Sequence, residues 1–357
     1  MRVLAAMSGG VDSAVAAALA AEAGCEVTGV TLKLWCYGHG PSSPRACCTV
    51  EAVEDARQTA RRMNFPHHVV NAEDLFRERV LEPFARGYAA GRTPYPCALC
   101  NQHLKFGDLL ARMELVGADR LVTGHYARVA ALEDGSWGLF RAVDRDKDQS
   151  YALAFVPYAA LARVHFPLGD LTKDQVRAHA SRLGLAVWDK PESQDLCFAP
   201  DGDYAAIVTK QLGAAPEPGP MVDAAGQPRG THRGLHRYTV GQRRGLGLAS
   251  SERLYVISIE PERNTIVVGE REALEAAGLV TEPMNWLLPA APEAGRAVEA
   301  QIRYQHAAAR ARAFPLPSGG VELRFERPQM AITPGQSCVL YDGDRVLGGA
   351  PIARSLP

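Results

Sequence analysis

The N-terminal half of the chain alternates between short apolar runs and longer stretches with apolar residues at helical spacing. Four runs are long enough for buried strands: 2–7, 26–34, 67–71 and 119–126. Four stretches have helical periodicity: 11–24, 50–63, 73–90 and 102–116. Alternation of this kind predicts a parallel sheet with helices on both faces, which binds ligands at the carboxyl ends of its strands. We therefore expect an α/β domain over residues 1–200.

The pattern changes in the C-terminal half. Residues 200–230 are rich in proline and glycine, which predicts a boundary region with turns rather than a packed helix. Short alternating runs at 253–260 and 265–270 predict a small β-rich central domain over 201–278. Further short strands with turn signals between them predict a small C-terminal β-barrel or sandwich over 279–357. The expected fold class is α/β, followed by two β-rich domains.

Composition limits the environment of the protein. The 357 residues are 47% hydrophobic and 22% charged, as in ordinary soluble domains. No stretch approaches the roughly 20 apolar residues that cross a bilayer, and the N-terminus runs directly into a glycine turn without a signal peptide. We expect a cytoplasmic protein with no membrane partner. Its eight cysteines are then expected to be thiols, catalytic groups or metal ligands rather than structural disulfides.

The formal net charge of −1 gives no global attraction for nucleic acid, so such binding has to come from local patches. One segment, 229–247, has no acidic residue and combines these basic and aromatic side chains: Arg229, His232, Arg233, His236, Arg237, Tyr238, Arg243 and Arg244. A stripe of this kind suits backbone phosphates, and Tyr238 either stacks on a base or packs inside the domain. A solvated basic face is an equally simple interpretation.

The sequence SGGVDS, Ser8 to Ser13, joins the first expected strand to the first expected helix. Free backbone N–H groups and the positive end of a helix hold phosphate at such a junction, and Gly9 and Gly10 let the backbone approach an anion closely. The two serines add hydroxyl donors, and Asp12 could hold Mg²⁺ against the phosphates. The turn is not a Walker A loop, because the GxxxxGK[ST] pattern and its lysine are absent.

SGGVDS resembles the PP-loop of ATP pyrophosphatases, which cleave ATP to AMP and pyrophosphate while they adenylate a substrate oxygen. Five further segments resemble those of the tRNA-specific 2-thiouridylases: PYPCALCNQHLKF (94–106), TGHYAR (123–128), DRDKDQSYAL (144–153), SQDLCF (193–198) and GLHRYTVGQRRGLG (234–247). The resemblance covers essentially the whole chain. It implies an adenine-nucleotide α-hydrolase-like (PP-loop) domain that uses ATP and Mg²⁺. The implied reaction adenylates O2 of the wobble uridine of tRNA, position 34, and yields 2-thiouridine, AMP and pyrophosphate.

The same resemblance implies roles for individual residues. Cys100 matches the nucleophile and Cys197 the persulfide carrier, and the two would form a transient disulfide. The implied ATP contacts are Ala6, Met7, Ser8, Gly9, Gly10, Val11, Asp12, Ser13, Leu32 and Gly124. The implied contacts with the target base or tRNA are Tyr95, Pro96, Cys97, His125, Lys147, Asp148, Gln149, Arg303, Tyr304 and Gln336. By residue type alone, His125 also fits a hydrogen-bonded structural histidine, and Leu32 also fits a core residue.

Cys97 departs from the family pattern, in which aspartate is common three residues before the nucleophile, so an acid/base role at this position is open. Cys97, Cys100 and Cys197 could supply three thiolates around one point, which suits an iron–sulfur cluster, whereas structural zinc would need a fourth ligand. Persulfide transfer, cluster-assisted transfer and structural zinc all stay open. Cys100 is expected at a helix N-terminus, which favours a reactive thiolate. Three more cysteines flank a loop without an assigned role: Cys36, Cys47 and Cys48.

The resemblance also implies partners. These are tRNAs with a wobble uridine, of the lysine, glutamate and glutamine anticodon types, and an upstream sulfur donor such as a cysteine desulfurase or a relay protein. Two other functions are compatible with the glycine turn. Another PP-loop synthetase acting on a small metabolite would need no cysteine pair, and a non-catalytic tRNA-binding or sulfur-carrier protein would release no pyrophosphate.

Overall fold

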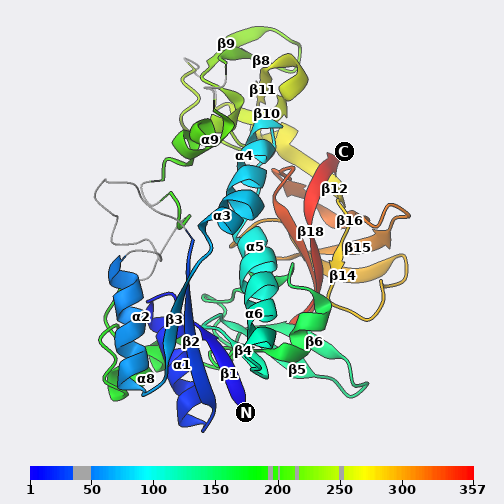
Figure 1. Cartoon of the computed structure of the whole chain (residues 1–357). Coiled ribbons are helices and arrows are strands. Elements are labelled where there is room, and N and C mark those ends of the chain that lie inside the picture. Colours follow the sequence, from blue (N-terminus) through cyan, green and yellow to red (C-terminus); the bar gives the residue numbers. More distant parts are fainter. Residues whose placement is uncertain (35–49, 192–195, 200–201, 214–216, 249–252) are drawn as a thin grey trace.

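The N-terminal part of the molecule is a five-stranded parallel sheet in the order β3-β2-β1-β4-β7 (Figure 1). The computed structural model describes residues 1–34, 50–191, 196–199, 202–213, 217–248 and 253–357. The strands of this sheet are β1 (Arg2–Ala6), β2 (Glu26–Lys33), β3 (His67–Asn71), β4 (Arg120–Val122) and β7 (Val164–His165). The predicted parallel α/β architecture is confirmed. Because β1 is central, the turn that follows it lies at the middle of the carboxyl edge.

Helices pack on both faces of this sheet, as the alternation of β1 side chains requires. Val3 and Ala5 belong to a core with the alanine-rich α1 (Val11–Glu22), which also packs against α8 (Lys173–Arg182). Leu4 belongs to a second core with α6 (Leu109–Leu115). The helix α2 (Val50–Arg62) also contacts α1.

Two of the predicted helices are continuous but contain a π-helical segment. The first consists of α3 (Glu73–Phe76), a π-helical segment at Arg77–Leu81 and α4 (Glu82–Ala89). The second consists of α5 (Pro96–Cys100), a π-helical segment at Asn101–Asp108 and α6. Such segments are frequent at functional sites. The second one begins directly after Cys100.

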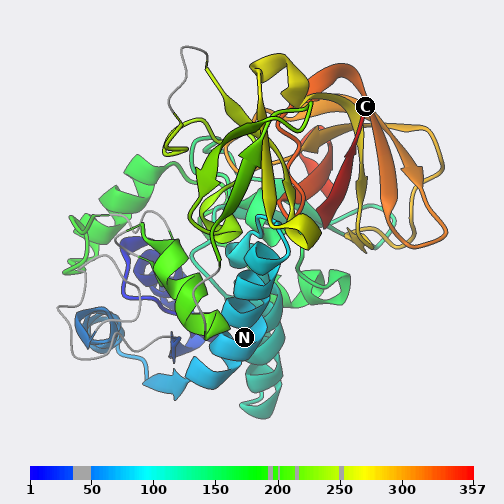
Figure 2. The ribbon, with the colours of Figure 1, turned by 90° about the horizontal axis from the view of Figure 1, so that it is seen from above.

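The central domain contains a four-stranded sheet in the order β10-β11-β8-β9. Its strands are β8 (Gly219–Val222), β9 (Pro228–His232), β10 (Tyr255–Glu260) and β11 (Thr265–Gly269). The expectation of turns without a packed helix at 200–230 was wrong, because α9 (Tyr204–Leu212) lies there alongside α4 (Figure 2). Asp203 caps its first turn, and Gly213 ends it with a φ of 72°. Those two capping residues were a usable sequence signal.

The C-terminal part is a closed antiparallel barrel, which confirms the barrel alternative. Its strands are β12 (Glu275–Thr281), β14 (Arg296–Gln301), β15 (Ala309–Pro315), β16 (Val321–Met330), β17 (Ser337–Asp342) and β18 (Arg345–Leu356). The order β12-β16-β15-β14-β17-β18 closes through pairing of β12 with β18. The short strand β13 (Asn285–Trp286) also pairs with β18.

A hairpin from the N-terminal part extends the barrel sheet. It consists of β5 (Ala127–Ala131) and β6 (Trp137–Arg141), and β6 pairs with β18. The loop before α5 and the short α7 (Ser150–Leu153) also lie against the barrel, as described below. The N-terminal and C-terminal parts therefore share a sheet. The expected domain ranges 1–200, 201–278 and 279–357 stay predictions. Within the described ranges, we find no helix with the length and apolar character needed to cross a membrane.

Candidate active site

The SGGVDS turn is held by its own side chains. The Ser8 backbone N–H donates to Ser13 Oγ at 3.0 Å, and Ser13 Oγ lies 3.1 Å from both Ser8 Oγ and the Gly10 carbonyl oxygen. Gly10 is the N-cap of α1 and has no side chain to satisfy the first N–H groups of the helix. The geometry of these N–H groups and of the positive end of α1 is therefore compatible with the anion cradle that the sequence predicts.

Packing requires glycine at two positions around this turn. Gly9 has a φ of +75°, and a Cβ there would lie 2.1 Å from the Ala52 carbonyl oxygen. A Cβ on Gly124, in the loop after β4, would lie 2.6 Å from the Ser13 backbone nitrogen. A Cβ on Gly10, by contrast, would meet nothing closer than Ser8 Oγ at 3.7 Å. The Gly10 position thus has open space, as the close approach of a phosphate requires.

The predicted ATP contacts come together at the carboxyl edge of the sheet. Ala6 is the last residue of β1, and Met7 follows it. Leu32 lies near the end of β2, and Gly124 lies after β4. Leu32 is half-buried and packs against two apolar cores, so a packing role and a nucleotide contact are compatible. The residues present fit an adenine nucleotide whose phosphates lie at the start of α1.

Two lysines that the sequence analysis missed reach the turn. Lys173 Nζ lies 2.7 Å from Asp12 Oδ1, which also accepts a hydrogen bond from the Tyr126 hydroxyl at 2.8 Å. Lys190 Nζ donates to the Gly9 carbonyl oxygen at 3.1 Å and pairs with Asp55 at 2.5 Å. Lys173 follows Thr172, which caps α8 in a capping box. The TKDQ sequence signals that helix start, but no sequence spacing shows that it faces Asp12.

Cys100 and Cys197 belong to the same apolar cluster, although 97 positions separate them in the chain. Cys100 is 9% exposed within the cluster, and the half-buried Cys197 packs against it. Phe198, next to Cys197, makes an edge-to-face contact with Phe84 at a centroid distance of 5.2 Å. The stacked pair Tyr88 and Tyr204 also belongs to this region. The fold therefore brings the two predicted catalytic thiols to one side of α4 and α9.

Cys100 does not lie in the first turn of its helix. The helix begins at Pro96, so Cys97 occupies the first turn and Cys100 the fifth position. Asn101, 2% exposed, donates from Nδ2 to the Ala152 carbonyl oxygen at 2.9 Å, while Oδ1 has no hydrogen-bond partner among the described residues. The amide of Asn101 therefore fixes the Cys100 helix to α7. The proposed activation of Cys100 by a helix N-terminus is not supported, because that terminus acts first on Cys97.

Cys97 is exposed and lies beside the Tyr95 hydroxyl. Burial, followed by the neighbouring Cys97 thiol and two tyrosines, raises the pKa of Tyr95. Cys97, Cys100 and Cys197 are all described, yet nowhere in the described ranges do three or more His, Cys, Asp or Glu side chains form a group suited to a metal ion. The three thiols therefore do not fit the iron–sulfur or zinc site that their types suggested. Cys36, Cys47 and Cys48 lie outside the described residues.

An aromatic cluster joins the catalytic part to the barrel. Tyr95 and Tyr304 are nearly parallel, with centroids 6.2 Å apart, and Tyr151 contacts both rings at 5.3 and 6.1 Å. Tyr151 donates from its hydroxyl to the Ser337 carbonyl oxygen at 2.8 Å. Gln336 donates from Nε2 to the Thr93 carbonyl oxygen at 2.9 Å. The fold thus brings together three predicted tRNA contacts from distant segments, Tyr95, Tyr304 and Gln336.

His125 is buried next to the nucleotide edge rather than exposed. Its Nδ1 lies 2.7 Å from Thr123 Oγ1, and its Nε2 lies 3.4 Å from Lys105 Nζ. Burial and the positive charge of Lys105 hold the pKa of His125 well below its usual value. A neutral ring with the proton on Nδ1 satisfies both contacts, since the ammonium group can only donate. His125 therefore supports Lys105, and its predicted contact with tRNA stays a prediction.

The predicted contacts at 147–149 also have internal roles. Asp148 accepts hydrogen bonds from the Ala142 N–H at 2.9 Å and the Ser150 hydroxyl at 2.7 Å. Gln149 Oε1 accepts from the Tyr126 N–H at 3.0 Å. Both side chains therefore shape the loop between β6 and α7, and Lys147 is the half-buried cation in that loop. Arg303 is half-buried beside Tyr304 in the barrel.

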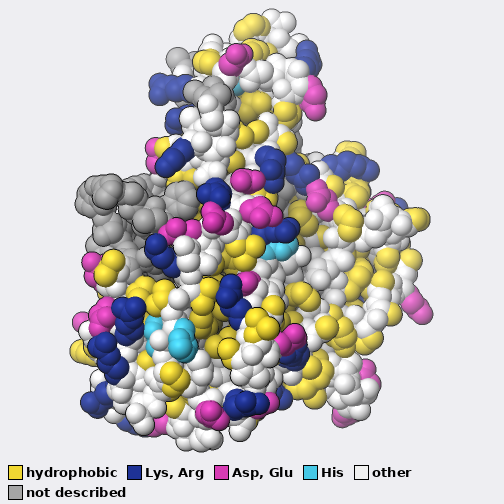
Figure 3. Space-filling model, viewed as in Figure 1, with side chains coloured by type: hydrophobic (Ala, Val, Ile, Leu, Met, Phe, Trp, Pro, Cys, Tyr) yellow, Lys and Arg dark blue, Asp and Glu magenta, His cyan; other side chains and the backbone are white. Residues whose placement is uncertain are grey.

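In the basic segment 229–247 the arginines are exposed, whereas the histidines and the tyrosine are buried. All five arginines are exposed, and Arg229 pairs with Asp223 at 2.8 Å. Tyr238, His232 and His236 are buried, so Tyr238 packs inside the domain. On the face shown in Figure 3, basic and acidic side chains are intermixed, in keeping with a net charge near zero. The exposed side chains that suit phosphate contacts are those of Arg233, Arg237, Arg243 and Arg244.

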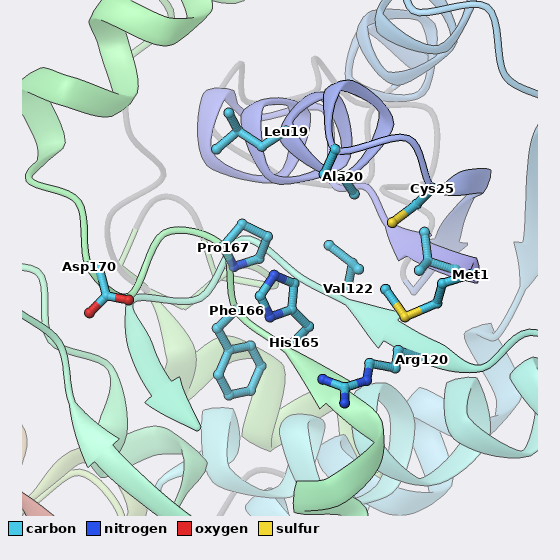
Figure 4. A pocket seen from close by; sticks show the side chains of 12 residues that line it. Met1, Leu19, Ala20, Cys25, Arg120, Val122, His165, Phe166, Pro167 and Asp170 are labelled. Carbon is cyan, nitrogen blue, oxygen red and sulfur yellow. The ribbon is translucent and has the colours of Figure 1, made fainter. Parts of the chain in front are cut away.

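A cavity of about 280 Å³ lies under the C-terminal end of α1 (Figure 4). Its lining includes Leu19, Cys25, Arg120, His165 and Phe166. Because α1 rises about 1.5 Å per residue, this cavity is separated from the SGGVDS turn by most of the length of the helix. It is therefore not the nucleotide site.

Three family models match the chain. They describe a tRNA methyl transferase HUP domain at residues 1–201, a tRNA methyl transferase PRC-barrel domain at 206–270 and an aminomethyltransferase beta-barrel domain at 276–352. The chain is 48% identical over 353 residues to the tRNA-specific 2-thiouridylase MnmA of Magnetococcus marinus, with 98% of each chain covered. It is 45% identical over 370 residues to the protein of the same name from a Roseiflexus species, with 99% of each chain covered.

Proposed function

The chain belongs to the tRNA-specific 2-thiouridylase family, and from this premise we propose that it exchanges O2 of the wobble uridine of tRNA for sulfur. As a member of that family it is an ATP-dependent, tRNA-thiolating sulfurtransferase. The observation that carries the residue-level proposal is the geometry of the site. One apolar cluster includes both cysteines and Leu34 after β2, and the glycine turn follows β1, the strand that pairs with β2. The products would be 2-thiouridine, AMP and pyrophosphate.

The first half-reaction is adenylation of uracil O2. ATP would bind with its phosphates at the N–H groups of α1, and Gly10 supplies the open space for them. Asp12 would help to hold Mg²⁺, which offsets charge on the phosphates when it is bound. Asp12 Oδ1 already faces Lys173 and Tyr126, so binding of the ion would change the contacts of this carboxylate. Uracil O2 forms a bond to the α-phosphorus, and the bond to pyrophosphate breaks.

The second half-reaction is sulfur transfer. Cys197 would carry a persulfide whose terminal sulfur reaches uracil C2, either directly or as hydrosulfide after attack by Cys100. In the direct route, sulfur bonds to C2 and the C2–O bond to AMP breaks. The Cys100 thiolate attacks Sγ of Cys197 and cleaves the S–S bond. The sulfane sulfur is reduced, the two cysteines form a disulfide, and an external dithiol reduces that disulfide.

The tRNA would lie across the junction of the three parts. Tyr95, Pro96 and Cys97 would face the target base, and the near-parallel Tyr95 and Tyr304 rings suit stacking with unpaired bases. The exposed arginines of 229–247 suit phosphate contacts. We propose that six further residues contact the tRNA directly or hold the residues that do: His125, Lys147, Asp148, Gln149, Arg303 and Gln336.

The reaction needs a partner that supplies sulfur. ATP makes the uracil oxygen a leaving group but brings no sulfur, so a cysteine desulfurase or a relay protein would have to load Cys197. We place the reaction in the cytoplasm, where tRNA and ATP are both available. The expected substrates are the lysine, glutamate and glutamine types of tRNA.

Nucleoside analysis of tRNA from cells that lack this gene tests the proposal. We expect loss of 2-thiouridine at the wobble position, and unchanged thiolation in a cell with no redundant enzyme would refute the function. In the purified system, Cys100→Ser and Cys197→Ser should each abolish thiolation while tRNA-dependent pyrophosphate release continues. A small-metabolite synthetase would instead form its product without either thiol, and a non-catalytic tRNA-binding protein would release no pyrophosphate.

A further inference from the structure

Lys173 is a buried cation that touches the PP-loop without belonging to its sequence motif. It is 8% exposed, and its ammonium group lies 2.7 Å from Asp12 Oδ1. Its backbone N–H, at the start of α8, donates to Asp144 Oδ2 at 2.9 Å. The main chain of Lys173 is therefore fixed, while a long side chain extends from it to the phosphate cradle. This arrangement lets the ammonium group move locally without any displacement of α8.

The phosphates of ATP need more positive charge than the turn itself supplies. SGGVDS contains no lysine, and a helix N-terminus provides the equivalent of only about half a positive charge. Lys190 also reaches the turn, but its ammonium group is paired with Asp55. Lys173 is paired with Asp12, the residue expected to bind Mg²⁺. Binding of Mg²⁺ and phosphates would therefore change the partners of both Asp12 and Lys173 together.

We propose that Lys173 is a catalytic residue of the adenylation step, which moves from Asp12 to the β- and γ-phosphates and stabilises the departing pyrophosphate. This inference rests on the proposed function. When uracil O2 bonds to the α-phosphorus, the bond to the β-phosphate oxygen breaks and its electron pair stays on pyrophosphate. Lys173 keeps its proton and neutralises that developing charge. No electron donor or further proton acceptor is required for this role.

The expected size of the effect follows from the position of the charge. Lys173 is nearly enclosed, so its interaction with a phosphate is only weakly screened by solvent. Removal of one such preorganised electrostatic contact typically lowers a rate by about 10²- to 10³-fold. Loss of affinity for pyrophosphate itself should accompany the loss of rate, because the same charge binds the product.

The test compares Lys173→Gln, Lys173→Arg and Arg182→Gln in the full-length protein. Gln can still donate to Asp12 but carries no charge, and Arg keeps the charge. Arg182 is a matched control, because it joins α8 to α1 through an ion pair with Glu22 at 2.6 Å, at the other end of the two helices. Single-turnover release of pyrophosphate with tRNA and calorimetric binding of pyrophosphate without tRNA are measured for each variant.

We expect Lys173→Gln to slow pyrophosphate release at least about 100-fold and to weaken pyrophosphate binding at least about tenfold. Lys173→Arg should recover most of both, and Arg182→Gln should stay within about twofold of the wild type. Equal behaviour of Lys173→Gln and Arg182→Gln in an active protein would overturn the inference, since Lys173 would then only dock α8. If the wild type released no pyrophosphate with tRNA but Lys173→Gln still lost affinity for pyrophosphate, the proposed function would fail instead. If Lys173→Gln does not fold, Lys173→Arg decides the question, because Arg keeps the charge. Weak pyrophosphate binding by a folded Lys173→Arg protein would then overturn the inference.

Discussion

The two glycines of the PP-loop give opposite predictions, although they are neighbours. Gly9→Ala would place a methyl group 2.1 Å from the Ala52 carbonyl oxygen at a φ of +75°. A left-handed residue other than glycine costs about 1–2 kcal/mol, and overpacking adds about 1–3 kcal/mol. We expect a free energy of unfolding lower by roughly 2–5 kcal/mol. Gly135→Ala is the control, because its φ is +78° and nothing lies within 4 Å, so it should cost only the first term.

Gly10→Ala should leave stability nearly intact but impair ATP binding. Its φ is −96°, its Cβ would meet only Ser8 Oγ at 3.7 Å, and alanine is worse than glycine as an N-cap by at most about 1 kcal/mol. The methyl group would instead occupy space that a phosphate needs. One lost hydrogen bond to a charged group is worth about 1.5–3 kcal/mol, or roughly 10- to 100-fold in Kd.

The assays for these glycines are thermal unfolding and calorimetric titration with ATP. The reasoning requires that Gly9→Ala lose stability and that Gly10→Ala lose affinity while its unfolding curve stays close to the wild type. A Gly10→Ala protein that binds ATP within about twofold of the wild type would refute the placement of phosphates at the start of α1.

Three further predictions follow from side chains around the site. His125 has a pKa well below the usual value near 6.5, so the unfolded state binds more protons below that pH and stability should fall as the solution is acidified. His125→Asn should flatten this slope in chemical unfolding at pH 5 to 7, and an unchanged slope would contradict the assignment. Tyr304→Ala should raise KM for tRNA about tenfold with little effect on Tm, since the ring is 45% exposed, whereas Tyr304→Phe should behave like the wild type. Cys97→Asp should retain thiolation within about tenfold of the wild type. If the wild type prepared without oxygen contained stoichiometric iron, and Cys97→Asp lost both this iron and its activity, the conclusion that the three thiols do not form a cluster site would be wrong.

Local sequence patterns predicted much of the N-terminal fold because the relevant signals are short in range. The strand and helix periods at 2–7, 11–24 and 26–34 correspond to β1, α1 and β2 with small differences at their ends. The local conformation of the glycine turn was accessible for the same reason, since the hydrogen bonds between its two serines and Gly10 lie within six residues. The missed helix α9 also had local signals, Asp203 and Gly213, but the surrounding proline and glycine residues obscured them.

The outcome at the cysteines shows where short-range patterns fail. Residue type suggested that Cys97 and Cys100 could be ligands of one metal site, but the helix that starts at Pro96 leaves Cys97 exposed and buries Cys100. Cys197 packs against the apolar cluster that contains Cys100, and no local pattern identifies this proximity. Only the resemblance to a family linked them in the sequence.

By itself, the sequence determined the parallel α/β architecture, the position of the glycine turn between β1 and α1, and the family, because these depend on periodicity, backbone conformation and residue identity. The tertiary structure decided which side chains meet: Lys173 with Asp12, Tyr95 with Tyr304, and the β5–β6 hairpin with the barrel. These contacts join residues more than 100 positions apart. Their formation depends on the packing of whole helices and sheets, which no local pattern encodes.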